Sequence, residues 1–246
     1  MTTILVTGGA GYIGSHTCKA LAAQGYTPVV FDNLSEGHRD FVRWGELIEG
    51  DVRDTARLQQ VLIEKFPAAV IHFAASAYVG VSIEQPQAYY ENNIIGSLSL
   101  LTAMRAAGCR NIVFSSSCAV YGKVDSLPIK PNQATMPINP YGRSKLAVEQ
   151  VLADCQAAYG LNSVSLRYFN AAGADPDCEI GEWHIPETHL IPNVIYAALD
   201  NSQPLQLFGN DYHTPDGTCV RDYVHVSDLA AAHVLAVEYL SGNQGG

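Results

Sequence analysis

Thr7-Gly8-Gly9-Ala10-Gly11-Tyr12-Ile13-Gly14 joins an apolar run to a helical pattern near the start of this 246-residue chain. Residues 4–7 are typical of a buried strand, and residues 12–24 have helical spacing. The stretch contains two overlapping patterns, G-x-G-x-x-G and G-x-x-G-x-x-G. Glycines allow a tight turn that brings the backbone close to a pyrophosphate, which the first N–H groups of the helix then bind. The stretch therefore predicts a strand–turn–helix unit that binds a dinucleotide.

An acidic residue follows at the expected distance. Asp32 closes the next apolar run, residues 28–31, and comes 18 positions after Gly14. A carboxylate at this place accepts a hydrogen bond from a ribose hydroxyl and repels the 2′-phosphate of NADP. We therefore expect NAD as the cofactor.

Strand-like runs and helical patterns alternate along the first two thirds of the chain. The expected strands are 4–7, 28–31, 47–49, 69–73, 111–115 and 163–168, and the expected helices are 12–24, 54–65, 85–107 and 139–159. Apolar runs separated by helices indicate a buried parallel sheet with right-handed crossovers. The predicted fold is α/β, a Rossmann-like doubly wound parallel sheet.

The amino-acid composition changes after residue 170. Residues 171–187 are rich in Gly, Pro and acidic residues, and elements are expected at 190–199 (helix), 205–208 and 220–224 (strands) and 227–239 (helix). We expect an NAD-binding domain over 1–170 and a smaller substrate lobe over 171–246, interleaved with the first domain. Because residues 242–246 follow a helix directly, we expect this lobe to be incomplete.

Composition excludes several classes of function. The net charge is −10 and Lys and Arg are scattered, so nucleic-acid binding is not expected. The mean hydropathy is +0.05, and there is no apolar stretch of membrane-spanning length and no secretory signal, so we expect a cytoplasmic protein. The six cysteines and eight histidines show no metal-ligand spacing, and no metal site is predicted. His72 is expected to be a hydrogen-bonded core histidine.

Small or polar residues follow each of the first five expected strands. Asp51 follows the third, Phe73-Ala74-Ala75 ends the fourth and Ser115-Ser116-Ser117 ends the fifth. Ligands of open α/β sheets bind at the carboxyl ends of the strands, so these residues are expected to line one site. Asp51 has two interpretations, a contact to adenine or a solvated turn residue.

Tyr141 and Lys145 lie four residues apart, one turn on the same face of a helix. Asn139-Pro140 before them indicates the helix start. A neighbouring ammonium favours the phenolate and lowers the pKa of a tyrosine, which would make Tyr141 a proton acceptor. The alternative interpretation is a surface pair on a helix.

Four motifs together carry a resemblance. The chain has T-G-G-A-G-Y-I-G at 7–14, S-S-S-C-A-V-Y-G at 115–122, Y-G-R-S-K at 141–145 and R-Y-F-N at 167–170. With these it resembles the extended short-chain dehydrogenase/reductase family, and within it the UDP-hexose 4-epimerase branch. The resemblance implies an isomerase with tightly bound NAD that interconverts UDP-glucose and UDP-galactose through a transient 4-keto sugar. It also suggests a homodimer formed through the helices at 85–107 and 139–159.

The resemblance also implies roles for single residues. The catalytic residues are Tyr141 as acid/base, Lys145 on the nicotinamide ribose and Ser117 on the sugar hydroxyl. The cofactor site comprises Gly8, Gly11, Tyr12, Ile13, Gly14, Asp32, Asn33, Ser35, Gly37, Asp51, Val52, Phe73, Ala74, Ala75, Asn92, Ser115, Tyr141, Lys145, Tyr168 and Phe169. The substrate site comprises Ser117, Tyr141, Asn170, His189, Leu190, Phe208 and Arg221, with Arg221 suited to a diphosphate.

The sequence departs from the family pattern at Ala77, where several members have Lys, and at His189, where some have Asn. Four alternatives remain: a UDP-pentose 4-epimerase, a 4,6-dehydratase, a dehydrogenase that releases NADH, and an NAD-binding fragment without turnover. Resembling dehydratases place acidic residues just after the serine, where this chain has Cys118-Ala119. The preferred UDP-sugar is left open.

Overall fold

Six parallel strands form the central sheet of the computed structural model, which describes residues 2–124, 126–200 and 204–242. These strands are β1 (Thr3–Thr7), β2 (Thr27–Asp32), β3 (Glu46–Glu49), β4 (Ala69–His72), β5 (Asn111–Ser115) and β6 (Asn162–Leu166). They lie in the order β3-β2-β1-β4-β5-β6. This is the strand order of doubly wound dinucleotide-binding folds, so the predicted fold class is confirmed.

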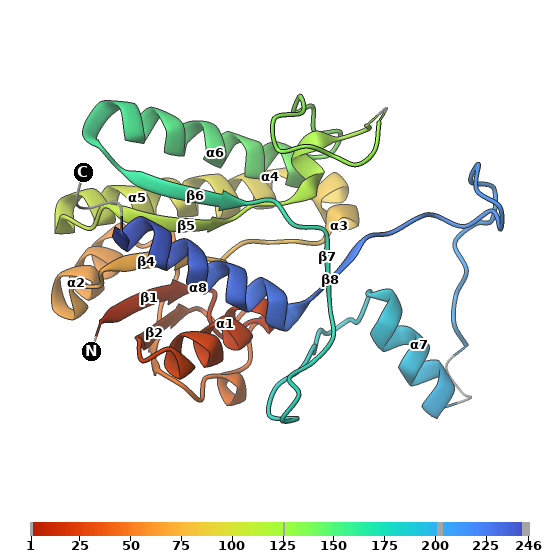
Figure 1. The fold of residues 1–246 in the computed structure, drawn as a ribbon, viewed down its shortest axis with the longest axis horizontal. Helices are drawn as coiled ribbons and strands as arrows, with labels where there is room; N and C mark the ends of the chain where they lie inside the picture. Colours follow the sequence, from red (N-terminus) through yellow and green to blue (C-terminus); the bar gives the residue numbers. More distant parts are fainter. Residues whose placement is uncertain (1, 125, 201–203, 243–246) are drawn as a thin grey trace.

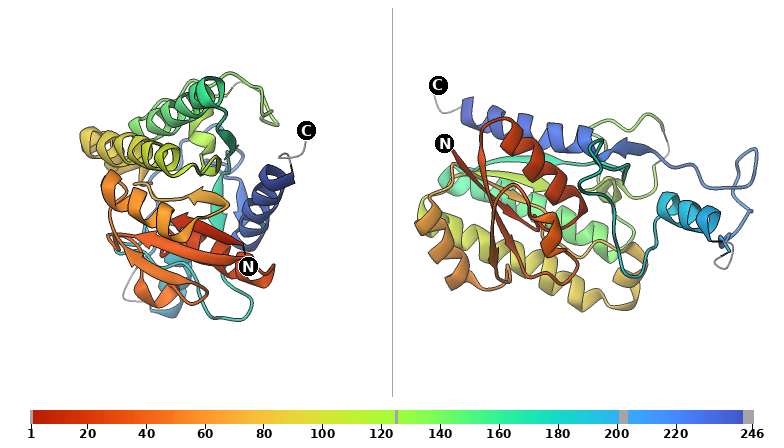
Figure 2. Two further views of the ribbon diagram at one scale, coloured as in Figure 1. Left: turned by 90° about the vertical axis from the view of Figure 1, so that its left-hand side faces the viewer. Right: turned by 90° about the horizontal axis from the view of Figure 1, so that it is seen from below.

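Helices cover both faces of the sheet (Figure 1). On one face lie α1 (Tyr12–Ala23) and α8 (Val226–Gly242), and on the other lie α2 (Thr55–Lys65), α5 (Gly96–Ala107) and α6 (Pro140–Tyr159). Figure 2 shows the three layers from two further sides. In the described part of the chain, every helix is too short or too polar to cross a bilayer.

The alternation of side chains along each strand creates two cores. Leu5 and Phe31 pack with α2, α5 and α6 in one cluster. Ile4 and Val6 pack with α1 and α8 in the other cluster. Successive strand residues point to opposite faces, so both faces of the sheet need apolar residues and the strands read as continuous apolar runs.

The helix ends follow the local signals in the sequence. The side chain of Asn139 accepts a hydrogen bond from the Gly142 N–H at 2.8 Å, and Pro140 is the first helical residue of α6. Gly108 and Gly160 end α5 and α6 with φ of 75° and 73°, in the left-handed region that suits glycine. Tyr141 therefore lies in the first turn of α6, as predicted.

The helical stretch expected at 85–107 has three parts. It comprises α4 (Pro86–Tyr89), the π-helical segment η2 (Tyr90–Ile95) and α5. Single π-helical turns within helices frequently mark functional sites. Three short helices were missed: α3 (Val79–Glu84) and the 3₁₀ turns η1 (Arg39–Phe41) and η3 (Cys118–Tyr121).

The C-terminal part of the chain is only partly packed on the sheet. Strand β7 (Asn170–Ala172) pairs in parallel with β8 (Tyr223–His225), and α7 (Leu190–Leu199) extends away from the sheet (Figure 1). The strand predicted at 205–208 is wrong, because these residues are exposed and lack strand geometry. The strand predicted at 220–224 begins later, at Tyr223, where β7 supplies its backbone partners. Helix α8 returns to the sheet, while a domain boundary at residue 170 stays a prediction.

We expect Gly14→Ala to destabilise the fold. A Cβ at Gly14 would lie 2.3 Å from the carbonyl oxygen of Gly8 and 2.8 Å from Cα of Gly9, both backbone atoms. Such a clash costs about 1–3 kcal/mol of unfolding free energy, measurable by urea denaturation. The control is Gly80→Ala, where a Cβ meets nothing within 4 Å. Equal stability of the two variants would contradict the tight packing of this turn.

Candidate active site

The glycine turn lies against the end of β4. Gly8 has φ of 74°, and a Cβ there would lie 2.5 Å from the Ala74 backbone nitrogen. Gly11 is the N-cap residue of α1, so the helix has no side-chain cap. A Cβ at Gly11 would meet only the Gly8 oxygen, at 3.4 Å. The first N–H groups of α1 thus face an open place suited to an anion. The Tyr12 hydroxyl itself donates to the Gly173 carbonyl oxygen, so only its backbone is available to a cofactor.

Asp32 lies beside this turn and braces it. One carboxylate oxygen accepts from the Ala10 N–H at 3.0 Å, and the other accepts from the Leu34 N–H at 2.8 Å. Burial raises the pKa of this carboxyl group. Each carboxylate oxygen has a further lone pair, so Asp32 keeps acceptor capacity for ribose hydroxyls. Gly37 packs on Ala10, which places the following loop against the turn.

Asp51 is bound by a residue that the sequence reasoning missed. Nε of Arg53 donates to one oxygen of Asp51 at 2.8 Å, and the amide of Asn33 donates to the other at 3.2 Å. The hydrogen bond from Arg53 holds the pKa of Asp51 well below its usual range. Ser35 donates in turn to the Asn33 side chain at 2.8 Å. Asp51 is thus an ion-paired turn residue, and a contact to adenine stays a prediction.

Lys145 is buried beneath the end of β5. Its ammonium group donates to the Ser115 carbonyl oxygen at 2.8 Å, and burial lowers its pKa to about 7. The Ser115 hydroxyl shares a hydrogen bond of 2.5 Å with the Tyr168 hydroxyl beyond β6. Three predicted site residues from β5, α6 and the end of β6 therefore meet at one point.

The Ser117 side chain lies near the Tyr141 hydroxyl and favours its ionised form. Ser117 also caps η3, accepting from the Ala119 N–H at 3.1 Å. The expectation that Lys145 lowers the pKa of Tyr141 is wrong for this structure. Burial raises the pKa of Tyr141 to about 12, and this effect outweighs the lowering by Ser117. The reason is the position of Lys145. Its ammonium nitrogen lies 5.8 Å from the centre of the Tyr141 ring and is itself desolvated.

The π-helical segment holds the neighbouring loop and α6 together. Asn93, which the sequence reasoning missed, accepts from the Ser76 N–H at 2.8 Å and donates to the Ser76 oxygen and the Ser144 hydroxyl, both at 3.0 Å. The predicted cofactor residue Asn92 donates to the Ser76 hydroxyl at 3.2 Å. Asn93 thereby positions the turn of α6 that carries Tyr141.

Other predicted residues have structural partners. His72 is a core histidine as expected, bonded to Thr7 at 2.6 Å and to Ser97 at 2.9 Å, and burial lowers its pKa to about 3. Val52 is buried against Gly96. A cofactor contact of Val52 therefore stays a prediction.

The predicted substrate residues are brought together only in part. Asn170 in β7 donates to the Asp222 carbonyl oxygen at 2.8 Å, next to Arg221. Arg221 lies close enough to Cys118, the residue after Ser117, to influence its pKa. Leu190 and Phe208 are 54% and 94% exposed, so neither is packed against the strand ends. Their substrate contacts stay predictions.

The residues at this edge fit a dinucleotide. Gly8 lets the turn pack closely on Ala74, Gly11 leaves room that a Cβ would fill, α1 presents an uncapped N-terminus, and Asp32 keeps acceptor capacity beside the turn. Beyond them lie the half-buried Tyr141 and the buried Lys145 on α6, and the buried Ser117 after β5. The edge can thus bind a dinucleotide and place a phenol, a hydroxyl and an amine at one reacting centre.

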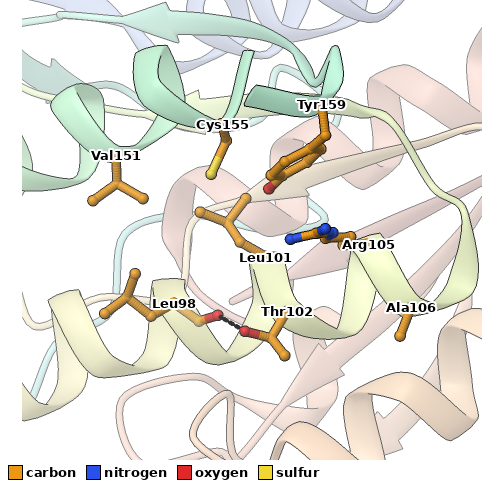
Figure 3. A pocket seen from close by; sticks show the side chains of 8 residues that line it. All are labelled: Leu98, Leu101, Thr102, Arg105, Ala106, Val151, Cys155 and Tyr159. Carbon is orange, nitrogen blue, oxygen red and sulfur yellow. Dashed lines mark hydrogen bonds between the residues drawn. The ribbon is translucent and has the colours of Figure 1, made fainter. Parts of the chain in front are cut away.

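A separate hollow of about 530 Å³ lies between α5 and α6 (Figure 3). Its lining includes Leu98, Leu101 and Val151, and the Arg105 guanidinium lies 4.9 Å from the ring centre of Tyr159. Leu98 is 42% exposed. This apolar face belongs to the two helices on which a homodimer was expected.

We expect Lys145→Met to stabilise the protein most at low pH. The unfolded lysine has a pKa near 10.5 and the folded one about 7, so between these values only the unfolded wild type binds the proton. The free energy of unfolding of the wild type therefore rises with pH across this window. The stability advantage of Lys145→Met over the wild type shrinks by roughly 2–4 kcal/mol. Urea unfolding at pH 6.5, 8 and 9.5 measures it. A difference independent of pH would contradict a desolvated Lys145.

Comparison with known proteins agrees with this geometry. Residues 4–246 match the model of the NAD dependent epimerase/dehydratase family. The UDP-glucose 4-epimerase of Rhizobium leguminosarum bv. trifolii is 61% identical over 238 residues, which are 97% of this chain and 73% of that protein.

Two solved structures extend the comparison. The UDP-glucose 4-epimerase from Brucella ovis in complex with NAD superimposes with a TM-score of 0.96 at 59% identity, covering all of this chain and 75% of that one. The enzyme from Bifidobacterium longum in complex with NAD+ and UDP has a TM-score of 0.92 at 40% identity, covering 96% and 74%. The chain therefore belongs to the NAD dependent epimerase/dehydratase family.

Proposed function

We propose that this protein is an isomerase that inverts C4 of a UDP-hexose, interconverting UDP-glucose and UDP-galactose with tightly bound NAD. One observation carries the proposal: Tyr141 lies near Ser117 and one helical turn from the buried Lys145, on the edge that carries the glycine turn. The similarity to UDP-glucose 4-epimerases, including one in complex with NAD, supports it.

The residues of the chain divide the work. Tyr141 takes the proton of the C4 hydroxyl and returns it, while Ser117 orients that hydroxyl. A bound NAD would supply the hydride acceptor and donor for C4 of the sugar, and the positive charge of its oxidised ring would favour the ionised phenol of Tyr141. Lys145 holds the nicotinamide ribose, and Arg221 suits the diphosphate.

The alternatives have less support. A 4,6-dehydratase needs an acid next to the serine, where Cys118 and Ala119 begin η3. A non-catalytic NAD-binding protein has no need of a tyrosine and a serine side by side next to a buried lysine. A UDP-pentose 4-epimerase would use the same residues, and only the substrate distinguishes it.

Incubation of the purified chain with UDP-glucose, UDP-galactose and UDP-xylose tests the activity. We expect the C4 epimer of the preferred sugar, formed in both directions without net NADH. Steady accumulation of NADH would indicate a dehydrogenase, and a 4-keto-6-deoxy product would indicate a dehydratase.

We expect Tyr141→Phe to lose at least about 100-fold in epimerisation rate, because it removes the proton-transfer group. The phenyl ring keeps the packing, so NAD should remain bound, as measured by NAD released on denaturation. Tyr239→Phe, on the exposed side of α8, is the matched control and should keep full activity. Normal turnover by Tyr141→Phe would rule out Tyr141 as the acid/base.

We further propose that the protein is a cytoplasmic homodimer formed through α5 and α6. The exposed Leu98 beside the hollow of Figure 3 supports this face, since burying apolar surface drives association. All six cysteines are unpaired, as in proteins of reducing compartments.

We expect Leu98→Glu to shift the protein from dimer to monomer, because dimerisation would bury the new carboxylate without a partner. Analytical ultracentrifugation measures the change in mass. Leu235→Glu, at an exposed leucine of α8 on the opposite face, is the control and should stay dimeric. A Leu98→Glu dimer would place the interface elsewhere.

A further inference from the structure

Two histidines and two glutamates gather in the loop between β7 and α7. The ligand atoms of Glu182, His184, Glu187 and His189 all lie within 4.8 Å of one another. The sequence pattern is E-x-H-x-x-E-x-H, which brings the four side chains together only because the loop folds back on itself. Our sequence-based expectation of no metal site did not consider this spacing.

The distances in this cluster suit a metal ion. Nδ1 of His184 lies 3.5 Å from an oxygen of Glu182 and 3.6 Å from an oxygen of Glu187, and Nδ1 of His189 lies 2.8 and 3.0 Å from the same two carboxylates. Zinc binds nitrogen and carboxylate oxygen at about 2.0–2.2 Å, so neighbouring ligands of a tetrahedral ion lie roughly 3.3–3.6 Å apart. Small side-chain adjustments would seat an ion among the four.

Two atoms of the cluster are buried without a hydrogen bond. Nδ1 of His184 and Oε2 of Glu187 are inaccessible and accept or donate no hydrogen bond. The side chains of Glu182 and Glu187 are each only 8% exposed. A buried polar atom without a hydrogen bond is costly, so a ligand that satisfies both atoms would stabilise the loop.

A second acidic cluster nearby shows the contrast. Asp175, Asp177 and Glu179 all bind the ammonium group of Lys19, at 2.8, 2.7 and 2.8 Å. The ion pairs of Glu182 and Glu187 in the described part of the chain are made with the two histidines instead. In the aspartate-rich cluster, Lys19 thus supplies the positive charge. The Glu/His cluster instead combines two buried carboxylates with two imidazoles.

We propose that Glu182, His184, Glu187 and His189 form a site for one divalent transition-metal ion, with Zn²⁺ as the ion that this donor set and geometry fit best. The two imidazole nitrogens are borderline donors that suit zinc, which also accepts carboxylate oxygens, whereas calcium and magnesium prefer all-oxygen sites. The rival explanation is a protonated His189 bonded to the carboxylates. It leaves His184 Nδ1 and Glu187 Oε2 without a hydrogen bond.

The bound ion would fasten the loop to the glycine-turn side of the molecule. The ring of His184 lies edge-on to Tyr12, with 6.3 Å between ring centres, and to Tyr78, with 6.1 Å. His189 directly precedes α7. The ion would thus link the start of α7 to the start of α1.

The experiment is zinc titration of the tag-free, EDTA-treated full chain by calorimetry, with metal content measured by mass spectrometry. We expect one Zn²⁺ per chain. His184→Ala and the isosteric Glu187→Gln should each weaken binding at least about 100-fold, because loss of an outer-shell partner alone costs 10–100-fold. Co²⁺ in the same site should give the visible absorption bands of four-coordinate cobalt in the wild type only.

Two matched variants leave the site intact. His213→Ala removes an exposed histidine and Asp177→Asn removes a carboxylate of the Lys19 cluster, and both should still bind one zinc. Circular dichroism checks folding, and Glu187→Gln carries the test if His184→Ala fails to fold. Absence of stoichiometric uptake by the wild type would overturn the proposal. So would unchanged binding in both site variants, which would place the ion elsewhere, for example on cysteines.

Discussion

The hydrogen bond from the buried ammonium of Lys145 to the Ser115 carbonyl oxygen connects the two parts of the active site. It ties α6, which carries Tyr141, to the end of β5, which leads into Ser117. Burial of an amine is unfavourable, and the protein accepts this cost where the amine is needed. The same bond fixes the distance between the tyrosine and the serine, and so the geometry available to a substrate hydroxyl.

The buried ionisable groups around this site are balanced in different ways. Glu149, beneath Ser116, is paired with Arg167, whose Nε lies 2.9 Å from its carboxylate. Lys145 has a lowered pKa in place of a close counter-ion. In the described part of the chain, the ion-pair partners of Glu182 and Glu187 are histidines. Full pairing is typical of structural support, whereas the groups without full pairing lie at the proposed active site and at the proposed metal site.

The two halves of the molecule differ in how they are held. The sheet and its helices form two closed cores, and α8 from the C-terminal part completes one of them. Helix α7, by contrast, has no buried residue, and Phe208 is almost fully exposed. The cofactor side is therefore defined by packing, whereas Asn170 and Arg221, two of the residues expected to contact the sugar nucleotide, are positioned by β7 and β8.

Local signals in the sequence were sufficient for the sheet, the glycine turn, the start of α6 and the Tyr141–Lys145 pair. Apolar runs, glycines and caps act over a few residues, so they can be read from the chain alone. Tertiary packing decided the rest. The pKa of Tyr141 depends on burial by distant segments, Asn93 acts through contacts 17 and 51 positions away, and β8 forms only where β7 lies beside it. The four-residue Glu/His cluster likewise exists because a loop without regular structure folds back, and no periodic pattern encodes that.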